Sequence, residues 1–145
     1  MTSLAPPNPP APPSPGELMD RLARAAAAYY RNFAAVAAGD GLTLMQGKVL
    51  SLLRRPMPMR TLAELLACDA SNVTGIIDRL EARDLVRREA DPADRRVKLV
   101  LLTETGQEAV RRIRAGVLAD LDGLAALAAP DREALGRLLD QVFPD

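Results

Sequence analysis

The spacing of hydrophobic and polar residues divides the chain into helical segments around one short strand-like region. Hydrophobic residues recur every three or four positions over residues 17–38, again after Thr43, and again over residues 104–143. This period is typical of amphipathic helices. After Leu85 the period shortens to that of β-strands. The pattern therefore predicts a mainly α protein with a small β-hairpin (α+β).

Capping signals divide the middle of the chain into short helices. Thr43 is the expected N-cap of one helix. Thr61 and Glu64 have the spacing of a capping box, which predicts a short helix that buries Leu62, Leu65 and Leu66. After a break, Asp69 or Ser71 is expected to cap a second short helix, whose buried face carries Val73, Ile76, Ile77 and Leu80. Two short helices separated by about three residues predict a helix-turn-helix.

A hairpin follows this motif. The runs LVRREA and VKLVLL flank the loop DPADRR, so we expect an antiparallel pair of strands with that loop at its tip. Helix, turn, helix and hairpin is the order of a winged helix, here over residues 43–103. A long helix is expected next, capped by Thr103 or by Thr105 with Glu108, and Pro130 is expected to begin the last helix.

The first and last helices carry more apolar surface than a winged domain of about 60 residues covers. A twofold dimer through residues 17–38 and 104–143 accounts for this surface. Residues 1–15 contain seven prolines, which predict a disordered Pro-rich tail. The remaining residues, 16–145, are long enough for a single domain.

Composition narrows the function classes. The 19 basic and 19 acidic residues cancel, and histidine is absent, which removes histidine-based catalysis and histidine-ligated zinc. The lone Cys68 excludes an intrachain disulfide and favours the cytoplasm. No apolar run approaches the ~20 residues of a membrane helix. We expect no enzyme, cofactor, metal or membrane partner, since the one carboxylate pair considered, Asp91 and Asp94, is expected on an exposed tip.

Two groups of polar residues are candidates for contacting DNA. On the second helix of the motif, small polar residues and one arginine lie away from the buried face and suit the major groove: Ser71, Asn72, Thr74, Gly75 and Arg79. At the hairpin tip, Arg95 and Arg96 can reach the minor groove while Asp94 holds one arginine in place. A solvated helix start, an ion pair of Arg79 with Asp78 or Glu81, and a solvated turn are the alternatives for these residues taken alone.

The stretches LTLMQGKVLSLL, RTLAELLACDASNVTGIIDRLEARDLVRR and DPADRRVKLVLLTETG resemble the MarR family of winged helix-turn-helix regulators, over about residues 17–143. The resemblance implies a homodimer that binds a pseudo-palindromic operator in double-stranded DNA. It places Ser71, Asn72, Thr74, Gly75 and Arg79 on the recognition helix, and Asp94 and Arg96 in the wing. The family usually has glycine where Asp84 stands, a position that takes the left-handed conformation, and we expect the same fold at a small cost.

The resemblance also implies a regulator, here a repressor, that a small anionic or aromatic ligand releases from DNA. Candidate pocket residues are Tyr29, Tyr30, Arg31, Phe33 and Met45, with ordinary core packing as the alternative. Two other functions stay open. One is a winged-helix protein-interaction module that does not read DNA, and the other is a redox-sensing regulator that acts through Cys68, for which a buried structural thiol is the alternative.

Overall fold

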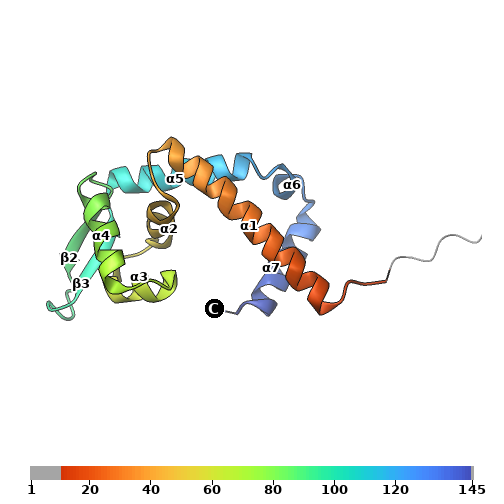
Figure 1. Cartoon of the computed structure of the whole chain (residues 1–145), viewed down its shortest axis with the longest axis horizontal. Helices are drawn as coiled ribbons and strands as arrows, with labels where there is room; N and C mark the ends of the chain where they lie inside the picture. The colour runs from red at the N-terminus through yellow and green to blue at the C-terminus, as the bar shows by residue number, and fades with distance from the viewer. Residues whose placement is uncertain (1–10, 145) are drawn as a thin grey trace, which may run out of the picture.

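The computed structural model describes residues 11–144. It is mainly α-helical with one small antiparallel sheet, which confirms the predicted fold class (Figure 1). The helices α2, α3 and α4 and the strands form one lobe, and α1 and α5 run from this lobe to α6 and α7 at the opposite end of the molecule. In chain order the elements are α1 (Pro15–Gly39), α2 (Leu44–Leu52), β1 (Met57–Pro58), α3 (Met59–Leu66), α4 (Ala70–Glu81), β2 (Val86–Ala90), β3 (Lys98–Leu102), α5 (Glu104–Ala119), α6 (Asp122–Ala125) and α7 (Ala129–Val142).

The start of α1 corrects the end of the predicted tail. Residues 1–10 lie outside the described residues, but Pro15 is already helical and Ser14 is the N-cap. The backbone N of Glu17 donates to Ser14 Oγ at 3.3 Å, and the backbone N of Ser14 donates to Glu17 Oε2 at 2.7 Å. Proline is well suited to the first turn of a helix, where its missing N–H would have no partner. The prediction of a tail up to residue 15 was therefore wrong at its end.

The first helix of the helix-turn-helix is capped differently from the prediction. α3 begins at Met59, with Pro58 in the N-cap position and no side-chain cap. Thr61 lies inside the helix, and Glu64 forms an exposed ion pair with Arg60 at 3.0 Å. The predicted Thr61–Glu64 capping box was wrong, because α3 already begins at Met59 and Thr61 is its third residue.

The turn between α3 and α4 contains a left-handed residue, Ala67, with φ of 50°. Asp69 occupies the N-cap position of α4 but makes no side-chain capping hydrogen bond, and Ser71 lies inside the helix. Asp69 is thus the N-cap residue, as one of the two predicted alternatives, but its side chain makes no capping hydrogen bond. Leu65, predicted to be buried, is 57% exposed.

The wing has one strand more than the sequence predicted. β2 and β3 pair antiparallel from Val86 opposite Leu102 to Ala90 opposite Lys98, as expected. β1 pairs with the other edge of β3, with Met57 opposite Val100, so the strand order is β1-β3-β2. Two residues are too few to show a strand period, which explains why β1 was missed.

The predicted long helix before Pro130 is interrupted. α5 ends at Ala119, and Leu121 departs from helical geometry with φ of −104° and ψ of 55°. Asp122 and Gly123 follow, and both are weak helix formers. Leu121 is half-buried and packs against the core. The short α6 therefore separates α5 from α7, which begins one residue before Pro130.

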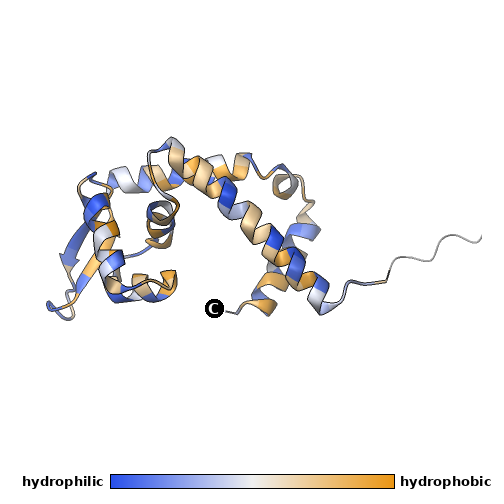
Figure 2. Cartoon of the chain, in the orientation of Figure 1, coloured by the Kyte–Doolittle hydropathy of each residue, from blue (hydrophilic) through white to orange (hydrophobic). Residues whose placement is uncertain are grey.

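The core lies in the winged lobe. Its fully buried side chains come from α2, α3, α4, β2, β3 and α5: Val49, Leu50, Leu62, Val73, Ile77, Leu80, Val86, Val100 and Ile113. α1 adds only Phe33 and Ala37 from its C-terminal part. At the other end of the molecule, hydrophobic positions also occur on α6 and α7, but no residue of these two helices is buried (Figure 2). The winged lobe thus has a core built from one chain, whereas α6 and α7 have no buried residue.

Candidate nucleic-acid interface

α4 presents one apolar and one polar face. Val73, Ile76, Ile77 and Leu80 are buried against the winged lobe. The opposite side, called here the reading face, consists of Ser71, Asn72, Thr74, Gly75 and Arg79, of which all but half-buried Gly75 are exposed. A Cβ added to Gly75 would meet nothing within 4 Å, so the surface there is open.

The side chains of the reading face differ in how much hydrogen-bonding capacity they keep. Thr74 Oγ1 donates to the carbonyl of Ala70 at 2.9 Å, within its own helix. Within residues 11–144, Asn72 and Arg79 make no side-chain hydrogen bond or ion pair. The donors of Asn72 and Arg79 are therefore free for an external acceptor. The Thr74 hydroxyl has used its one donor, and its lone pairs can only accept from an external donor.

The tip of the wing is held in shape by its own aspartates. The backbone N of Ala93 donates to Asp91 Oδ1 at 2.8 Å. The backbone N and the Nε of Arg96 both donate to Asp94 Oδ1 at 3.1 Å. The hydrogen bonds from the Arg96 side chain and then from its backbone hold the pKa of Asp94 below its usual value of 3.8. Asp94 thus remains ionised and shapes the tip.

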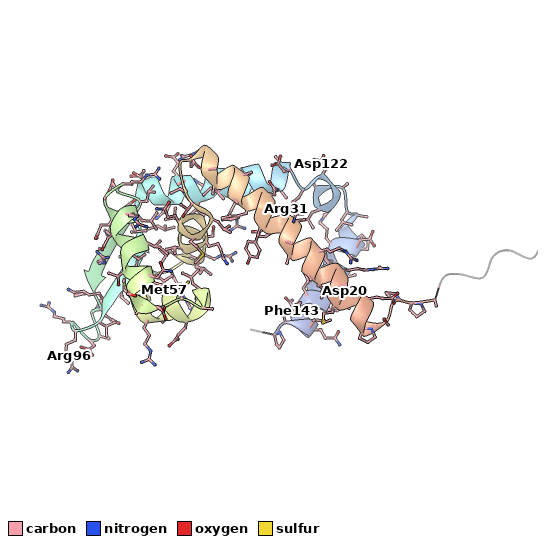
Figure 3. All side chains as sticks on the ribbon, in the orientation of Figure 1. Asp20, Arg31, Met57, Arg96, Asp122 and Phe143 are labelled. Carbon is pink, nitrogen blue, oxygen red and sulfur yellow. The ribbon has the colours of Figure 1, made fainter. Side chains whose placement is uncertain are left out.

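Arg96 nevertheless remains available for a partner. Its side chain is 91% exposed, against 43% for that of Asp94, and it points away from the body of the protein at the end of the wing (Figure 3). Arg95 beside it is also exposed. The tip therefore presents two guanidinium groups, of which one is oriented by Asp94.

The carboxylates considered as partners of Arg79 bind another arginine instead. Arg88 of β2 donates to Asp78 and to Glu81 of α4, so the strand and the helix are joined by a double ion pair. The sequence offered no local signal for this contact, because Arg88 lies seven and ten positions after its partners. The strand alternation alone places Arg88 on the face of β2 opposite that of Arg87 and Glu89, which pair with each other at 2.7 Å.

The link between α4 and β2 confirms the expectation for Asp84. Its φ is 56°, in the left-handed region. Thr103 Oγ1 donates to the carbonyl of Asp84 at 2.5 Å and accepts from the backbone N of Gly106 at 3.0 Å, so Thr103 caps α5 as predicted and also fixes the link. Nearby, Arg83 donates to the carbonyls of Asp40 and Gly41 at 2.8 Å each, which ties the end of α4 to the turn between α1 and α2.

A pocket of about 370 Å³ lies between α1, α2 and α5. Two of the candidate ligand residues line it, Tyr29 and Phe33. The other three do not: Tyr30 lies under the ammonium group of Lys48, which is 4.6 Å from the ring centroid, Arg31 is exposed, and Met45 is half-buried beside the core.

The sequence did not single out the polar groups of this pocket, which are Ser51, Arg54 and Arg114. Ser51 Oγ is buried and lacks a hydrogen-bond partner within the described residues. The two guanidinium groups favour an anion. The apolar part of the lining favours an aromatic or aliphatic body.

Cys68 lies in the turn between α3 and α4. Its side chain is half-buried, and Sγ donates to the carbonyl of Leu66 at 3.3 Å. Within the described residues it is the sole cysteine. The contact ties the thiol to the backbone of the turn, which is compatible with a structural role.

Comparison with known proteins identifies the family. The sequence model of the MarR family matches residues 42–98. A putative transcriptional regulatory protein for the hcr operon of Thauera aromatica is 30% identical over 132 residues, which cover 88% of this chain and 80% of that protein. The chain belongs to the MarR family. The transcriptional repressor NicR of Pseudomonas putida is 39% identical over 84 residues, which cover 54% of this chain and 53% of NicR.

The fold agrees with this assignment. The crystal structure of CouR from Rhodococcus jostii RHA1 bound to p-coumaroyl-CoA matches with a TM-score of 0.71 at 26% identity, over 89% of this chain and 94% of CouR. As a MarR-family protein, the chain is a DNA-binding transcriptional regulator and not an enzyme. Among residues 11–144, no helix has the length and apolar character needed to cross a membrane.

Proposed function

We propose that this MarR-family chain acts as a homodimeric repressor of a pseudo-palindromic operator, with α4 in the major groove and the wing in the minor groove. The observation that carries the proposal is the pairing of two exposed features: a reading face with free polar groups and a wing tip whose Arg96 is oriented by Asp94. A helix of about 10–12 Å diameter fits the ~12 Å major groove.

The residues of the reading face suit different groups of the DNA. Asn72 can pair with adenine through both groups of its amide, and Ser71 can donate to bases or phosphates. Thr74, whose hydroxyl donates to Ala70, can accept from the amino group of a base. Gly75 has open space outside its Cα, which permits close approach of the helix to the bases. Arg79, one turn further along, suits a phosphate.

The wing supplies the second contact. An arginine that projects from a narrow hairpin suits the minor groove, where A·T-rich sequence enhances the negative potential. We assign Arg96 to this groove, Asp94 to orienting it, and Arg95 to a phosphate. The lowered pKa of Asp94 supports its part, since the ionised carboxylate is the form that holds the guanidinium.

The terminal helices support a homodimer. α7 has 14 residues and none of them is buried. A helix of this length is marginal without packing on its apolar face. The large apolar side chains left exposed on α1, on α7 and just after it are Leu18, Met19, Leu22, Leu135, Leu138, Leu139, Val142 and Phe143. A second copy that covers them would give a dimer with two α4 helices, and an operator with half-sites one helical turn of DNA apart requires these helices to lie ~34–36 Å from each other.

A ligand is proposed for the pocket that Tyr29, Phe33, Ser51, Arg54 and Arg114 help to line. The two arginines and the apolar lining suit an aromatic carboxylate or a related organic anion. Two relatives point in the same direction: NicR is a repressor, and CouR was crystallised with the acyl thioester p-coumaroyl-CoA. Binding of such an anion would release the operator.

The first test is DNA binding by the full chain. Fragments of the source genome that the protein retains would be selected, and their affinity measured by fluorescence anisotropy at several salt concentrations. We expect saturable, salt-sensitive binding, and Arg96→Ala to weaken it by on the order of tenfold or more. The matched control is Arg111→Ala, an exposed arginine of α5 that pairs with Glu108. Retention of fragments without sequence preference would contradict the proposal and favour a protein-interaction module.

The second test concerns the pocket. Benzoate and 4-hydroxybenzoate serve as probes, and the readouts are the thermal midpoint of the protein and the affinity for the selected operator. We expect a probe that binds to raise the midpoint and weaken operator binding, with both effects lost in Arg54→Ala or Arg114→Ala. A response that survives both substitutions would exclude this pocket as the anion site.

A further inference from the structure

A double ion pair joins the wing to the recognition helix beside the reading face. The guanidinium of Arg88 on β2 donates through one terminal nitrogen to Asp78 and through the other to Glu81. The Arg88 side chain is 27% exposed, so this pairing is partly shielded from water. Such charge-assisted contacts are stronger than pairs in full solvent.

Glu81 also binds the backbone of the strand. The backbone N of Arg88 donates to Glu81 Oε1 at 3.2 Å. β2 is an edge strand, because the strand order is β1-β3-β2, and an edge strand has N–H groups without a partner in the sheet. The Glu81 side chain therefore holds the backbone of β2, and the Arg88 side chain forms a second link between β2 and α4.

Asp78 stands next to the reading face. It follows Thr74 by four positions and Ser71 by seven, so the three residues lie on one stripe of α4. Its side chain is 58% exposed. With α4 in the major groove, an unneutralised carboxylate at this place would face the phosphates at close range, and like charges across an interface weaken binding.

Arg88 is poorly placed for binding DNA itself. Both of its terminal nitrogens are engaged with carboxylates, and its exposure is 27%, against 91% for Arg96 at the tip. Arg88 would therefore affect DNA binding indirectly. It neutralises the carboxylates of Asp78 and Glu81, and it holds β2 against α4.

We propose that Arg88 is a positioning residue for operator binding: it neutralises Asp78 and Glu81 beside the reading face and fixes the wing to α4. The inference rests on the proposed placement of α4 and the wing on DNA. Arg88 would make no DNA contact itself, but it would set the charge beside α4 and the position of the wing relative to α4.

The test compares operator affinities of single and combined variants of the full chain. We expect Arg88→Ala to weaken binding by about tenfold or more. Adding Asp78→Asn and Glu81→Gln to Arg88→Ala should recover part of the loss, because the unpaired negative charges are then gone while the side-chain link from the strand to α4 is still missing. Arg87→Ala is the matched control, because it removes the same charge from the adjacent position of the same strand. Among residues 11–144 Arg87 pairs only with Glu89, so its removal should cost much less.

Salt dependence separates positioning from direct contact. Each phosphate contact contributes about 0.9 to the slope of log affinity against log salt concentration. A positioning residue leaves this slope nearly unchanged, so a drop of about one in Arg88→Ala would overturn the proposal. So would a combined variant that binds as weakly as Arg88→Ala. If Arg88→Ala does not fold, Arg88→Gln with and without Asp78→Asn gives the same comparison.

The outcomes also separate this inference from the proposed function. If the wild-type chain retains no specific fragment, or if Arg96→Ala binds as well as wild type, the DNA-reading assignment fails and the role of Arg88 fails with it. If wild type binds and Arg96→Ala weakens binding while the Arg88 series is flat, only the inference about Arg88 is overturned.

Discussion

Gly106, in the first turn of α5, is the point where this helix touches the link between α4 and β2. A Cβ at Gly106 would lie 2.9 Å from the carbonyl carbon of Leu85 and closer still to its oxygen, and 3.3 Å from Leu102 Cδ2. The Leu85 carbonyl cannot easily withdraw, because it accepts from the backbone N of Thr103 at 3.2 Å, and Thr103 Oγ1 also holds the preceding carbonyl of Asp84. Gly106→Ala would therefore force two backbone segments apart.

The expected cost of Gly106→Ala combines three effects. Alanine favours the helix over glycine by about 1 kcal/mol. Overpacking costs about 1–3 kcal/mol, and the upper end applies here because a backbone must yield in place of a side chain. The hydrogen bonds from Thr103 to Leu85 and Asp84 would weaken, at about 0.5–1.5 kcal/mol each. The net result is a loss of roughly 3–5 kcal/mol in the free energy of unfolding.

The assay is urea unfolding at a fixed protein concentration, followed by circular dichroism. Gly75→Ala is the matched control, because Gly75 is also helical but a Cβ there meets nothing within 4 Å. We expect the control to gain about 0.5–1 kcal/mol. A Gly106→Ala protein as stable as wild type would refute the argument, since it would mean that α5 does not approach the link this closely.

Three further predictions concern the reading face and the wing. Asp84→Gly should raise the free energy of unfolding by about 0.5–1 kcal/mol, because glycine adopts the left-handed conformation at φ of 56° without strain, and urea unfolding would show no gain if the link is relaxed. Arg96→Ala should raise the pKa of Asp94 toward 3.8 in a carboxyl NMR titration. Because the folded-state pKa is lowered, the contribution of this pair to stability is complete above about pH 4 and is lost as the pH falls through the folded-state pKa; an unchanged pKa would argue against the pair. Gly75→Ala should weaken operator binding despite its gain in stability, and equal affinity would indicate that the helix backbone stays away from the bases.

The predictions from sequence were right where one face of a helix or strand is buried, because burial gives its hydrophobic residues a regular spacing. Val73, Ile76, Ile77 and Leu80 are spaced as a helix requires, and all four are buried. The hairpin was found for the same reason, because its alternation and charged loop are local signals. The left-handed link was found through the substitution of the usual glycine by Asp84. In these places local preference and tertiary packing agree.

Sequence reasoning failed where tertiary contacts decide. Thr61 and Glu64 have capping-box spacing, but α3 already begins at Met59, with Pro58 as its N-cap. Leu121 fits the helical period of α5, yet it leaves the helix and packs against the core. The partners of Arg88 were missed because a contact between a helix and a strand leaves no fixed spacing along the chain. The groups lining the pocket, such as Ser51, come together only when three helices meet.

The position of the pocket suggests how the binding of a ligand would affect α4 and the wing. The pocket lies where α1 and α5 meet α2 of the winged lobe. Arg83 ties the end of α4 to the turn after α1, and Arg112 of α5 binds Asp40 in the same turn at 3.1 Å. A ligand that separates α1 from α5 would therefore move the attachment point of the recognition helix. In the proposed dimer the two α4 helices must stay about 34–36 Å apart, so a rotation at this junction would reduce the affinity for the proposed operator.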